Sequence, residues 1–445
     1  MNPTERLAAF IAETSADQVP QVVLEKSKWP VLDFLAVALA GYPHEVGRTM
    51  TAFVRELGGN PQATVLADGY RTNAPLAAYA IGALAHAQDY DDLNVNIGGH
   101  PTVPVLSALL PVGEMVHATG KEILLAYILG VETETKLGRA IIKIHYNLGW
   151  HPTATLGTLG AAAACSKLLG LDGEKTLMAL GIAASGSSGL KQNFGTMTKP
   201  LHVGQAAKNG VLAALLARRG WTADRQILEG HFGFCNLFCG AGRYDLTGLS
   251  EQLGNPWDIL DPGISLKKYP CCGSIHSALD ALFGMLQEVP LREEQVEKME
   301  CRVDPTKVHV LVHPRPSTGL EGKFSLEYCL ASGLLDGKVS LAQFDDERVR
   351  DSRVQNLLTR ISATKDEAVP EWFAQLRVKA TDGRELCRES GKSPGITRWE
   401  ELADKFRDCA VPVLGNEKAD RALKMAQRLE ELPDIAELMQ TLTRP

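Results

Sequence analysis

Long apolar stretches are missing from this sequence. Hydrophobic residues make up 45% of its 445 positions. No uninterrupted apolar run approaches the roughly 20 residues of a membrane-spanning helix. The N-terminus also lacks a basic segment that leads into an apolar one, so we expect no signal peptide. We therefore expect a cytoplasmic protein without a membrane partner.

Cysteine is sparse and follows neither a metal-binding nor a disulfide pattern. The nine cysteines are scattered, and only Cys271 and Cys272 are adjacent. Neither a C-x2-C pair nor a three-cysteine iron–sulfur pattern occurs, and the number is odd. This usage is typical of reduced thiols in a cytosolic protein and argues against a disulfide framework.

A basic excess is missing as well. Lys and Arg total 46 against 53 Asp and Glu, which gives a net charge of −7. Nucleic acid is therefore not an expected partner, because a phosphate backbone requires a basic face. No Gly-x-Gly-x-x-Gly motif follows a predicted strand, and strand–helix alternation does not repeat. A Rossmann domain is therefore not expected.

Helical periodicity dominates two parts of the chain. From about 75 to 220 the predicted helices are unusually rich in alanine and glycine, which lets helices pack closely. Helical spacing returns over 399–442. A chain of this length can hold more than one structural unit. We therefore predict a large, discontinuous all-helical domain built from residues 1–265 and 398–445.

The part between these helical regions has a different pattern. Short segments alternate from 296 to 388, with Val308, Val310 and Val312 on one side of a predicted strand. The segment from Phe373 to Ala380 shows a similar period, and Thr-Asp-Gly-Arg at 381–384 is a hairpin signal. We predict a smaller α+β lid domain over 266–397, in a protein that is mainly α.

The densest group of titratable residues lies between Ala85 and Pro101, at the end of a predicted helix of small residues. It consists of His86, Asp89, Asp91, Asp92 and His100. If the helix continued, His86 and Asp89 would share a face, as would Asp89 and Asp92. Carboxylates at the end of an apolar helix are unfavourable unless they are solvated, paired or used as caps. The histidines favour a functional site, and a solvated acidic turn is the alternative.

Three further segments carry candidate site residues. Gly149–Gly157 places His151 before a helix start whose free N–H groups and dipole suit an anion. Lys199 precedes a proline, so we predict an extended backbone at a helix entrance. Leu266–His276, with two lysines and two cysteines, lies at the domain junction and could close over a substrate. The alternatives are an ordinary helix cap, solvated cations and a simple linker.

Five motifs follow one another along the chain. They are His-Ala-Gln-Asp-Tyr-Asp-Asp with a later His-Pro, Gly-Trp-His-Pro-Thr-Ala-Thr, Thr-Lys-Pro-Leu-His, Lys-Lys-Tyr-Pro and Lys-Phe-Ser-Leu-Glu-Tyr. With them the sequence resembles the MmgE/PrpD family over nearly its whole length. That family includes 2-methylcitrate dehydratases, cis-aconitate decarboxylases and iminodisuccinate epimerases. The resemblance implies a helical domain with an α+β lid, a homodimer, and cofactor-independent chemistry on small di- or tricarboxylates.

The resemblance also implies a set of site residues. Carried over by motif, the catalytic residues are Asp89, His100, His151, Lys199 and Lys267. From the same motifs we expect the substrate to contact His202, Lys268, Cys272, Leu93 and Tyr328. Histidine suits acid or base duty, and the lysines suit the stabilisation of a carbanion-like state beside a carboxylate. We expect Asp89 to orient a histidine, and we expect none of these residues to bind a metal.

Three departures from the decarboxylase pattern guide the functional prediction. Leu93 stands where that pattern has threonine, and Cys272 stands where it has histidine. The interval from Asp89 to His100 is also one residue longer than in the decarboxylase. We therefore predict a lyase of the 2-methylcitrate dehydratase type, with an epimerase or a decarboxylase on a related acid as the alternative.

Two other classes of protein stay open. A metal-dependent hydratase or hydrolase would draw its oxygen and imidazole ligands from His86, Asp89, Asp92, His100 and His151. Lysines in the same pocket would repel a cation, which disfavours this reading. A non-catalytic helical interaction protein is the third class, and it would bind no polycarboxylate.

Overall fold

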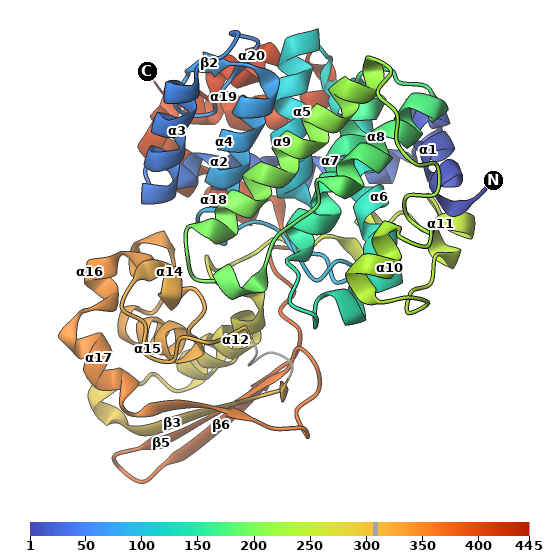
Figure 1. Ribbon diagram of the computed structural model, residues 1–445. Helices are drawn as coiled ribbons and strands as arrows, with labels where there is room; N and C mark the ends of the chain where they lie inside the picture. The colour runs from blue at the N-terminus through green and yellow to red at the C-terminus, as the bar shows by residue number, and fades with distance from the viewer. Residues whose placement is uncertain (306–309, 445) are drawn as a thin grey trace.

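The computed structural model describes residues 1–305 and 310–444. The first part of the chain forms a helical body, which occupies the upper part of Figure 1. Its helices are α1 (Pro3–Glu13), α2 (Gln21–Gly41), α3 (Glu45–Leu57), α4 (Ala74–His86), α5 (Thr102–Val116), α6 (Gly120–His145), α7 (Pro152–Leu168), α8 (Gly173–Ser185), α9 (Thr198–Arg218), α10 (Phe234–Cys239) and α11 (Thr247–Glu251). A short ribbon of β1 (Ala63–Thr64) and β2 (Arg71–Thr72) joins α3 to α4.

Glycine and alanine bring the central helices into backbone contact. A Cβ atom on Gly82 of α4 would lie 2.7 Å from the Cα of Gly204 in α9. A Cβ atom on Gly210 of α9 would lie 2.4 Å from the Cβ of Ala161 in α7. Because no larger side chain fits at these crossings, the small residues are required for the packing of α9 against α4 and α7. The tightly packed bundle predicted from the composition is confirmed.

The C-terminal helices pack onto the N-terminal ones. They are α18 (Trp399–Leu414), α19 (Asn416–Gln427) and α20 (Ala436–Thr441), and Figure 1 shows α18 and α19 beside α2. A buried ion pair joins Lys405 Nζ of α18 to Asp33 Oδ1 of α2 at 2.6 Å. The Ala67 N–H also donates to the Leu442 carbonyl at 2.9 Å. The tail therefore completes the core of the helical body.

Among the described residues, no helix combines the length and apolarity of a membrane span.

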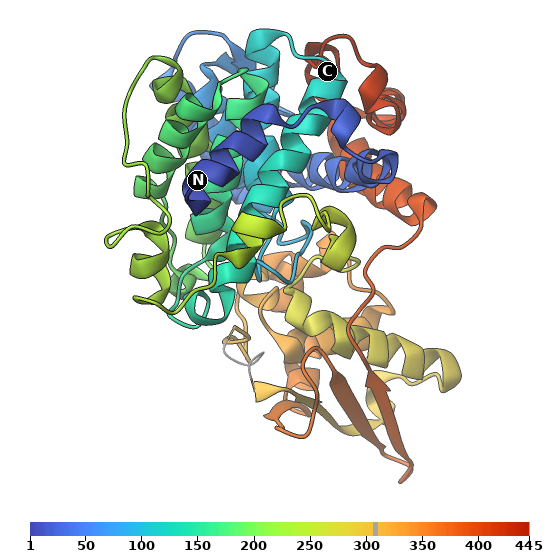
Figure 2. The same ribbon diagram turned by 90° about the vertical axis from the view of Figure 1, so that its right-hand side faces the viewer.

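A four-stranded sheet covered by helices forms the second body, at the bottom of Figures 1 and 2. Its elements are β3 (Val296–Val303), β4 (Ile361–Lys365), β5 (Ala374–Ala380), β6 (Glu385–Ser390), α12 (Gly273–Glu288), α14 (Gly319–Gly322), α15 (Leu326–Asp336), α16 (Asp346–Val349) and α17 (Ser352–Leu358). The strand order is β4-β3-β5-β6, with β3 and β4 parallel and the other pairs antiparallel. Leu282, Leu330 and Val378 belong to its separate core. The mainly α class with a small α+β part is confirmed.

The strand predictions are confirmed in part. Residues 381–384 form the turn between the antiparallel strands β5 and β6, as the hairpin signal predicts. The strand predicted around Val310 is wrong for the part that the structure describes, because residues 310–313 form a turn and irregular backbone. Val310 is buried, whereas Val312 is 54% exposed, so the two valines do not share one buried face. Val308 lies outside the described residues.

The chain crosses between the two bodies at two adjacent places. It leaves the helical body near Leu266 and returns near Ile396, and the Ile396 N–H donates to the Leu266 carbonyl at 2.9 Å. Lys405 of α18 donates to the carbonyl of Lys267 at 3.1 Å, which fixes the first crossing to the body. We propose these crossings as the domain boundaries, close to the predicted 265/266 and 397/398.

Candidate active site

A cavity of about 900 Å³ lies between the helical body and the lid. The body contributes polar residues from four separate segments, and the lid contributes the start of α12 and two aromatic side chains. The lining residues that matter below are Asp89, Leu93, His100, His151, Phe194, Lys199, Lys267, Cys272, Gly273, Ser274, Ser277, Phe324 and Trp372. All five residues expected to be catalytic therefore line one cavity.

Asp89 is held between two lysines. Helix α4 ends at His86, as expected for a cluster at the end of a helix, and Asp89 lies in the following turn with a φ of 49°. Lys199 donates to Asp89 Oδ1, and Lys267 Nζ lies 3.0 Å from Asp89 Oδ2. Burial raises the pKa of Asp89 more than any other influence. The charges of Lys199 and Lys267 together outweigh it and leave this pKa below its ordinary value.

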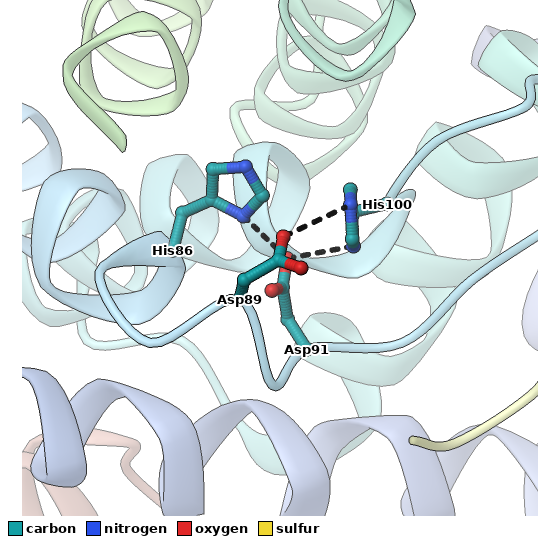
Figure 3. A group of neighbouring side chains, drawn as sticks. All are labelled: His86, Asp89, Asp91 and His100. Atoms are coloured by element: carbon teal, nitrogen blue, oxygen red, sulfur yellow. Dashed lines mark hydrogen bonds and ion pairs between the residues drawn. The ribbon is translucent and has the colours of Figure 1, made fainter. Parts of the chain in front are cut away.

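A second carboxylate, Asp91, binds both neighbouring histidines (Figure 3). Its Oδ2 lies 2.7 Å from His86 Nδ1 and 3.1 Å from His100 Nδ1. Sequence reasoning assigned a histidine-orienting role to Asp89. The closest approach of Asp89 to a histidine is 3.8 Å, from Oδ1 to His100 Nε2. Asp91 lies in the predicted segment, but nothing in the spacing distinguished it from its acidic neighbours.

These contacts define the tautomers of His86 and His100. Burial lowers the pKa of His86 to about 3, so its ring is neutral at pH 7 and Nδ1–H faces the Asp91 carboxylate. His100 Nδ1 lies near Asp91 Oδ2 and 2.8 Å from the Asp92 carbonyl, and both oxygens are acceptors. Nδ1 of His100 therefore carries a hydrogen, which leaves Nε2 to accept a proton from the cavity.

His151 is the N-cap of α7, as the Thr/Gly-rich sequence predicts, but its side chain does not cap the helix. Its Nδ1 lies 3.1 Å from Nδ1 of His202 in α9. Burial and the charge of Lys199 lower the pKa of both imidazoles, that of His202 to about 4. His151 Nε2 is buried and has no hydrogen-bond partner among the described residues. It is available to a ligand in the cavity.

Lys199 lies where the body and the lid meet. It is in the first turn of α9, so the extended backbone predicted before Pro200 is wrong; proline is tolerated in the first turn of a helix. Its Nζ lies 5.3 Å from the ring centre of Phe194, in the body, and 5.2 Å from that of Phe324, in the lid. The ammonium is therefore within cation–π distance of one ring from the body and one from the lid.

The start of α12 forms the lid side of the cavity. Cys272 is its N-cap, and Gly273, Ser274 and Ser277 of the first turns also line the cavity. A Cβ atom on Gly273 would lie 2.3 Å from Leu93 Cδ1, so glycine leaves room for this leucine. Ser277 Oγ donates to the Trp372 carbonyl at 2.7 Å. Cys272 and Leu93 thus face each other across the junction of lid and body.

Three of the residues expected to contact the substrate do not line the cavity. The side chain of Lys268 is 56% exposed and lies 3.7 Å from Asp280 Oδ1. Tyr328 is buried in the lid core, where its hydroxyl donates to the Gln343 carbonyl. His202 contacts His151 instead. Aromatic and basic residues of a motif can pack in a core or support another site residue instead of contacting the substrate. Their spacing in the sequence does not distinguish these roles.

Family profiles match both bodies of the chain. The MmgE/PrpD N-terminal domain matches residues 5–247, and the MmgE/PrpD C-terminal domain matches residues 269–431. The chain belongs to the MmgE/PrpD family. The resemblance carried by the five motifs is therefore confirmed.

Similar MmgE/PrpD proteins carry two activities in their names. A cis-aconitate decarboxylase from Mus musculus is 28% identical over 99% of this chain and 93% of its own length. The Homo sapiens cis-aconitate decarboxylase is 27% identical over 99% and 95%. A 2-methylcitrate dehydratase from Escherichia coli (strain K12) is 23% identical over 80% of each chain. Both the predicted activity and its decarboxylase alternative thus occur within the family.

Proposed function

We propose that this protein is a cofactor-independent lyase that acts at the carbon alpha to a carboxylate of a small di- or tricarboxylate. One observation carries the proposal: Lys199 and Lys267 share the single carboxylate of Asp89 inside the cavity. The two buried ammonium groups exceed the Asp89 carboxylate by one charge, and the neighbouring Asp91 carboxylate binds His86 and His100. Such a preorganised cation attracts a substrate carboxylate and stabilises the negative charge that develops beside it.

Two histidines can handle the proton in this mechanism. His100 presents Nε2 next to the Asp89 group, and His151 presents an unpartnered Nε2. Removal of the proton alpha to a carboxylate produces a carbanion-like state, which Lys199 and Lys267 stabilise. The second histidine then serves as the acid for the leaving group or for the carbon that is reprotonated. His100 and His151 are therefore proposed as the acid–base pair.

We place dehydration first among the possible outcomes. Leu93, Phe194 and Phe324 give the cavity an apolar side beside its polar one, which suits an acid with an alkyl branch. The 2-methylcitrate dehydratases among the relatives act on such an acid by their names. Epimerisation of an iminodisuccinate-like acid uses the same proton removal. Decarboxylation of a cis-aconitate-like acid instead loses CO2 and leaves a carbanion-like state, which an acid then protonates. These two reactions are the alternative outcomes.

A proton-exchange screen tests this proposal. Purified protein is incubated in D2O with citrate-, aconitate- and aspartate-related acids, including 2-methylcitrate and cis-aconitate, and each recovered acid is analysed for deuterium. We expect deuterium at the carbon alpha to a carboxylate in at least one acid. Product analysis then separates an unsaturated acid from CO2 release and from inversion. No deuterium in any acid would contradict the proposal.

A metal-dependent hydratase or hydrolase is the second candidate, because four side chains could hold an ion. Ligand atoms of His86, Asp89, Asp91 and His100 lie within 4.8 Å of one another. This set replaces the predicted one, since Asp92 binds Thr102 and His151 binds His202. The lysines on Asp89 compete with a cation for its oxygens. Loss of activity on chelation, with recovery on adding one divalent metal, would favour this candidate.

Two further properties are proposed, the first from the family resemblance and the second from the composition of the sequence. We propose that the protein is a homodimer, with twice the chain mass of 48.1 kDa, which light scattering after gel filtration would test. We also propose a cytoplasmic location, which cell fractionation would test. A small polycarboxylate remains the expected ligand.

A further inference from the structure

His202 lies behind the cavity rather than in it. It is half-buried, and its Nδ1 lies 3.1 Å from Nδ1 of His151. Imidazole nitrogens can form a hydrogen bond only if one donates and the other accepts. The two rings therefore share one hydrogen between their Nδ1 atoms. The tautomer of one ring therefore determines that of the other. It also determines whether His151 Nε2 donates or accepts a hydrogen in the cavity.

We infer that His202 is a positioning residue that connects the cavity histidine His151 to solvent by proton relay. This inference rests on the proposed function, since it requires His151 to exchange a proton with the substrate. His151 lines the cavity and is fully enclosed, whereas His202 is accessible to water. A proton that reaches His151 has a direct path outward through the shared hydrogen bond.

Backbone contacts hold the two rings against each other. The His151 N–H donates to the Gly189 carbonyl at 3.0 Å, which fixes the start of α7. Gly189 has a φ of 133°, and a Cβ atom there would lie 3.4 Å from His151 Cβ and 3.5 Å from His202 Cγ. Glycine therefore suits both this backbone conformation and the limited space beside the pair.

Helix α9 couples the relay to the site. Lys199 and His202 are three residues apart, so they project from the same face of α9. Lys199 reaches Asp89 in the cavity, and His202 reaches the imidazole of His151. One rigid helix thus positions both the electrostatic group and the relay.

The proton balance is complete without another reactant. At the start, His151 carries hydrogen on Nδ1 and His202 carries it on Nε2. His151 Nε2 accepts the substrate proton, His151 Nδ1–H passes its proton to His202 Nδ1, and His202 Nε2–H gives its proton to water. Each ring gains one proton and loses one, so both stay neutral and exchange tautomers. The reverse sequence delivers a solvent proton to the cavity.

Three variants test the relay. His202→Asn retains a short hydrogen-bonding side chain but cannot pass a proton through a ring, and His202→Phe retains a ring without nitrogen. His231→Asn is the matched control, because His231 is exposed and its ring contacts Phe232, which does not line the cavity. For the acid that the wild type labels fastest in D2O, the ratio of deuterium wash-in to turnover is measured.

We expect this ratio to fall by about 10-fold or more in His202→Asn, within the contribution of a positioned acid or base. The reason is that the removed proton returns to the substrate when it cannot reach solvent. A fourth variant, His202→Ala, removes the ring, and added imidazole should restore wash-in in it. A purely structural role would lower wash-in and turnover together. An unchanged ratio in folded His202→Asn would overturn the relay.

Ring-nitrogen NMR separates failure of the relay from failure of the proposed function. In protein labelled with 15N-histidine, the relay predicts that His151 ring shifts change in His202→Phe and not in His231→Asn. If the wild type labels no acid but these shifts change, the proposed function fails while the shared hydrogen stands. If the His151 shifts are the same in His202→Phe, the relay fails whatever the activity.

Discussion

Lys267 binds Asp89 at two atoms: its Nζ lies 2.6 Å from the Asp89 carbonyl and 3.0 Å from Oδ2. The lysine stands at the crossing into the lid, and the aspartate in the turn after α4. Burial acts to lower the pKa of Lys267, but Asp89 and Asp91 outweigh it and raise this pKa. The charge around Asp89 therefore depends on the position of Lys267, and with it on the position of the lid.

Lys267→Ala should lower turnover by about 100-fold or more, because it removes a preorganised charge from the site. In the wild type we expect a polycarboxylate to protect the segments 85–101 and 266–276 from hydrogen exchange together, and Lys267→Ala should abolish this joint protection. Lys268→Ala is the matched control, since the neighbouring side chain is exposed. Steady-state kinetics and hydrogen-exchange mass spectrometry provide the measurements. Equal effects of the two variants would remove Lys267 from the site.

Asp91→Asn should lower turnover by roughly 100-fold or more while substrate binding changes less. The amide has no negative charge, and its NH2 group can take the place of the oxygen toward one of the rings, so the Nδ1–H tautomers of His86 and His100 are no longer enforced. Because Asp91 acts on the reacting histidine and not on the substrate, kcat should fall more than KM changes, and steady-state kinetics measure this split. Asp420→Asn, on the exposed surface of α19, is the control. An unchanged kcat in folded Asp91→Asn would contradict this role.

Leu93→Thr should shift substrate preference. The leucine side chain reaches to within contact of Gly273 in the lid, and its backbone is fixed by the bond from its N–H to Ser265 at 2.8 Å. Threonine removes apolar volume, so preference for an alkyl-branched acid over its unbranched analogue should fall by about 10-fold. Ratios of kcat/KM for 2-methylcitrate and citrate measure this change. A ratio that does not move would show that Leu93 does not contact the branch.

The sequence was sufficient to place the fold class and the five catalytic candidates, because motif order and helical periodicity are local signals. It could not separate Lys267 from Lys268. Adjacent residues in an extended segment point to opposite sides, and which side is buried depends on the helical body. Asp89 gives a similar case: periodicity does not reveal where α4 ends, and the left-handed turn is stabilised by lysines distant in sequence.

His202 and Tyr328 show a different limit. The motif placed His202 three residues after Lys199, but its partner His151 is 51 positions away and lies there only in the folded chain. Tyr328 lies in an equally specific motif and is packed into the lid core. The motifs therefore located the right segments, but they did not distinguish residues that line the cavity from residues that pack elsewhere.

Glu134 of α6 gives a prediction on stability rather than activity. It is fully buried, and neither carboxylate oxygen has a hydrogen-bond partner among the described residues. Burial, and next the nearby Asp92, raise its pKa well above the ordinary value of 4.5. The folded protein therefore keeps this proton to higher pH than the unfolded chain does. As pH rises above 4.5, the unfolded chain ionises first and the free energy of unfolding falls.

Glu134→Gln removes this titration while nearly preserving the shape of the side chain. Relative to the wild type, the variant should gain stability as pH rises from about 5 to 8, by up to about 1.4 kcal/mol per pH unit. The desolvation of the amide is the same at both pH values, so it cancels from this difference. Denaturant unfolding at the two pH values provides the measurement. Glu56→Gln, on the exposed face of α3, should show no such slope. A pH-independent difference for Glu134→Gln would mean that the carboxyl group titrates alike in the folded and unfolded states.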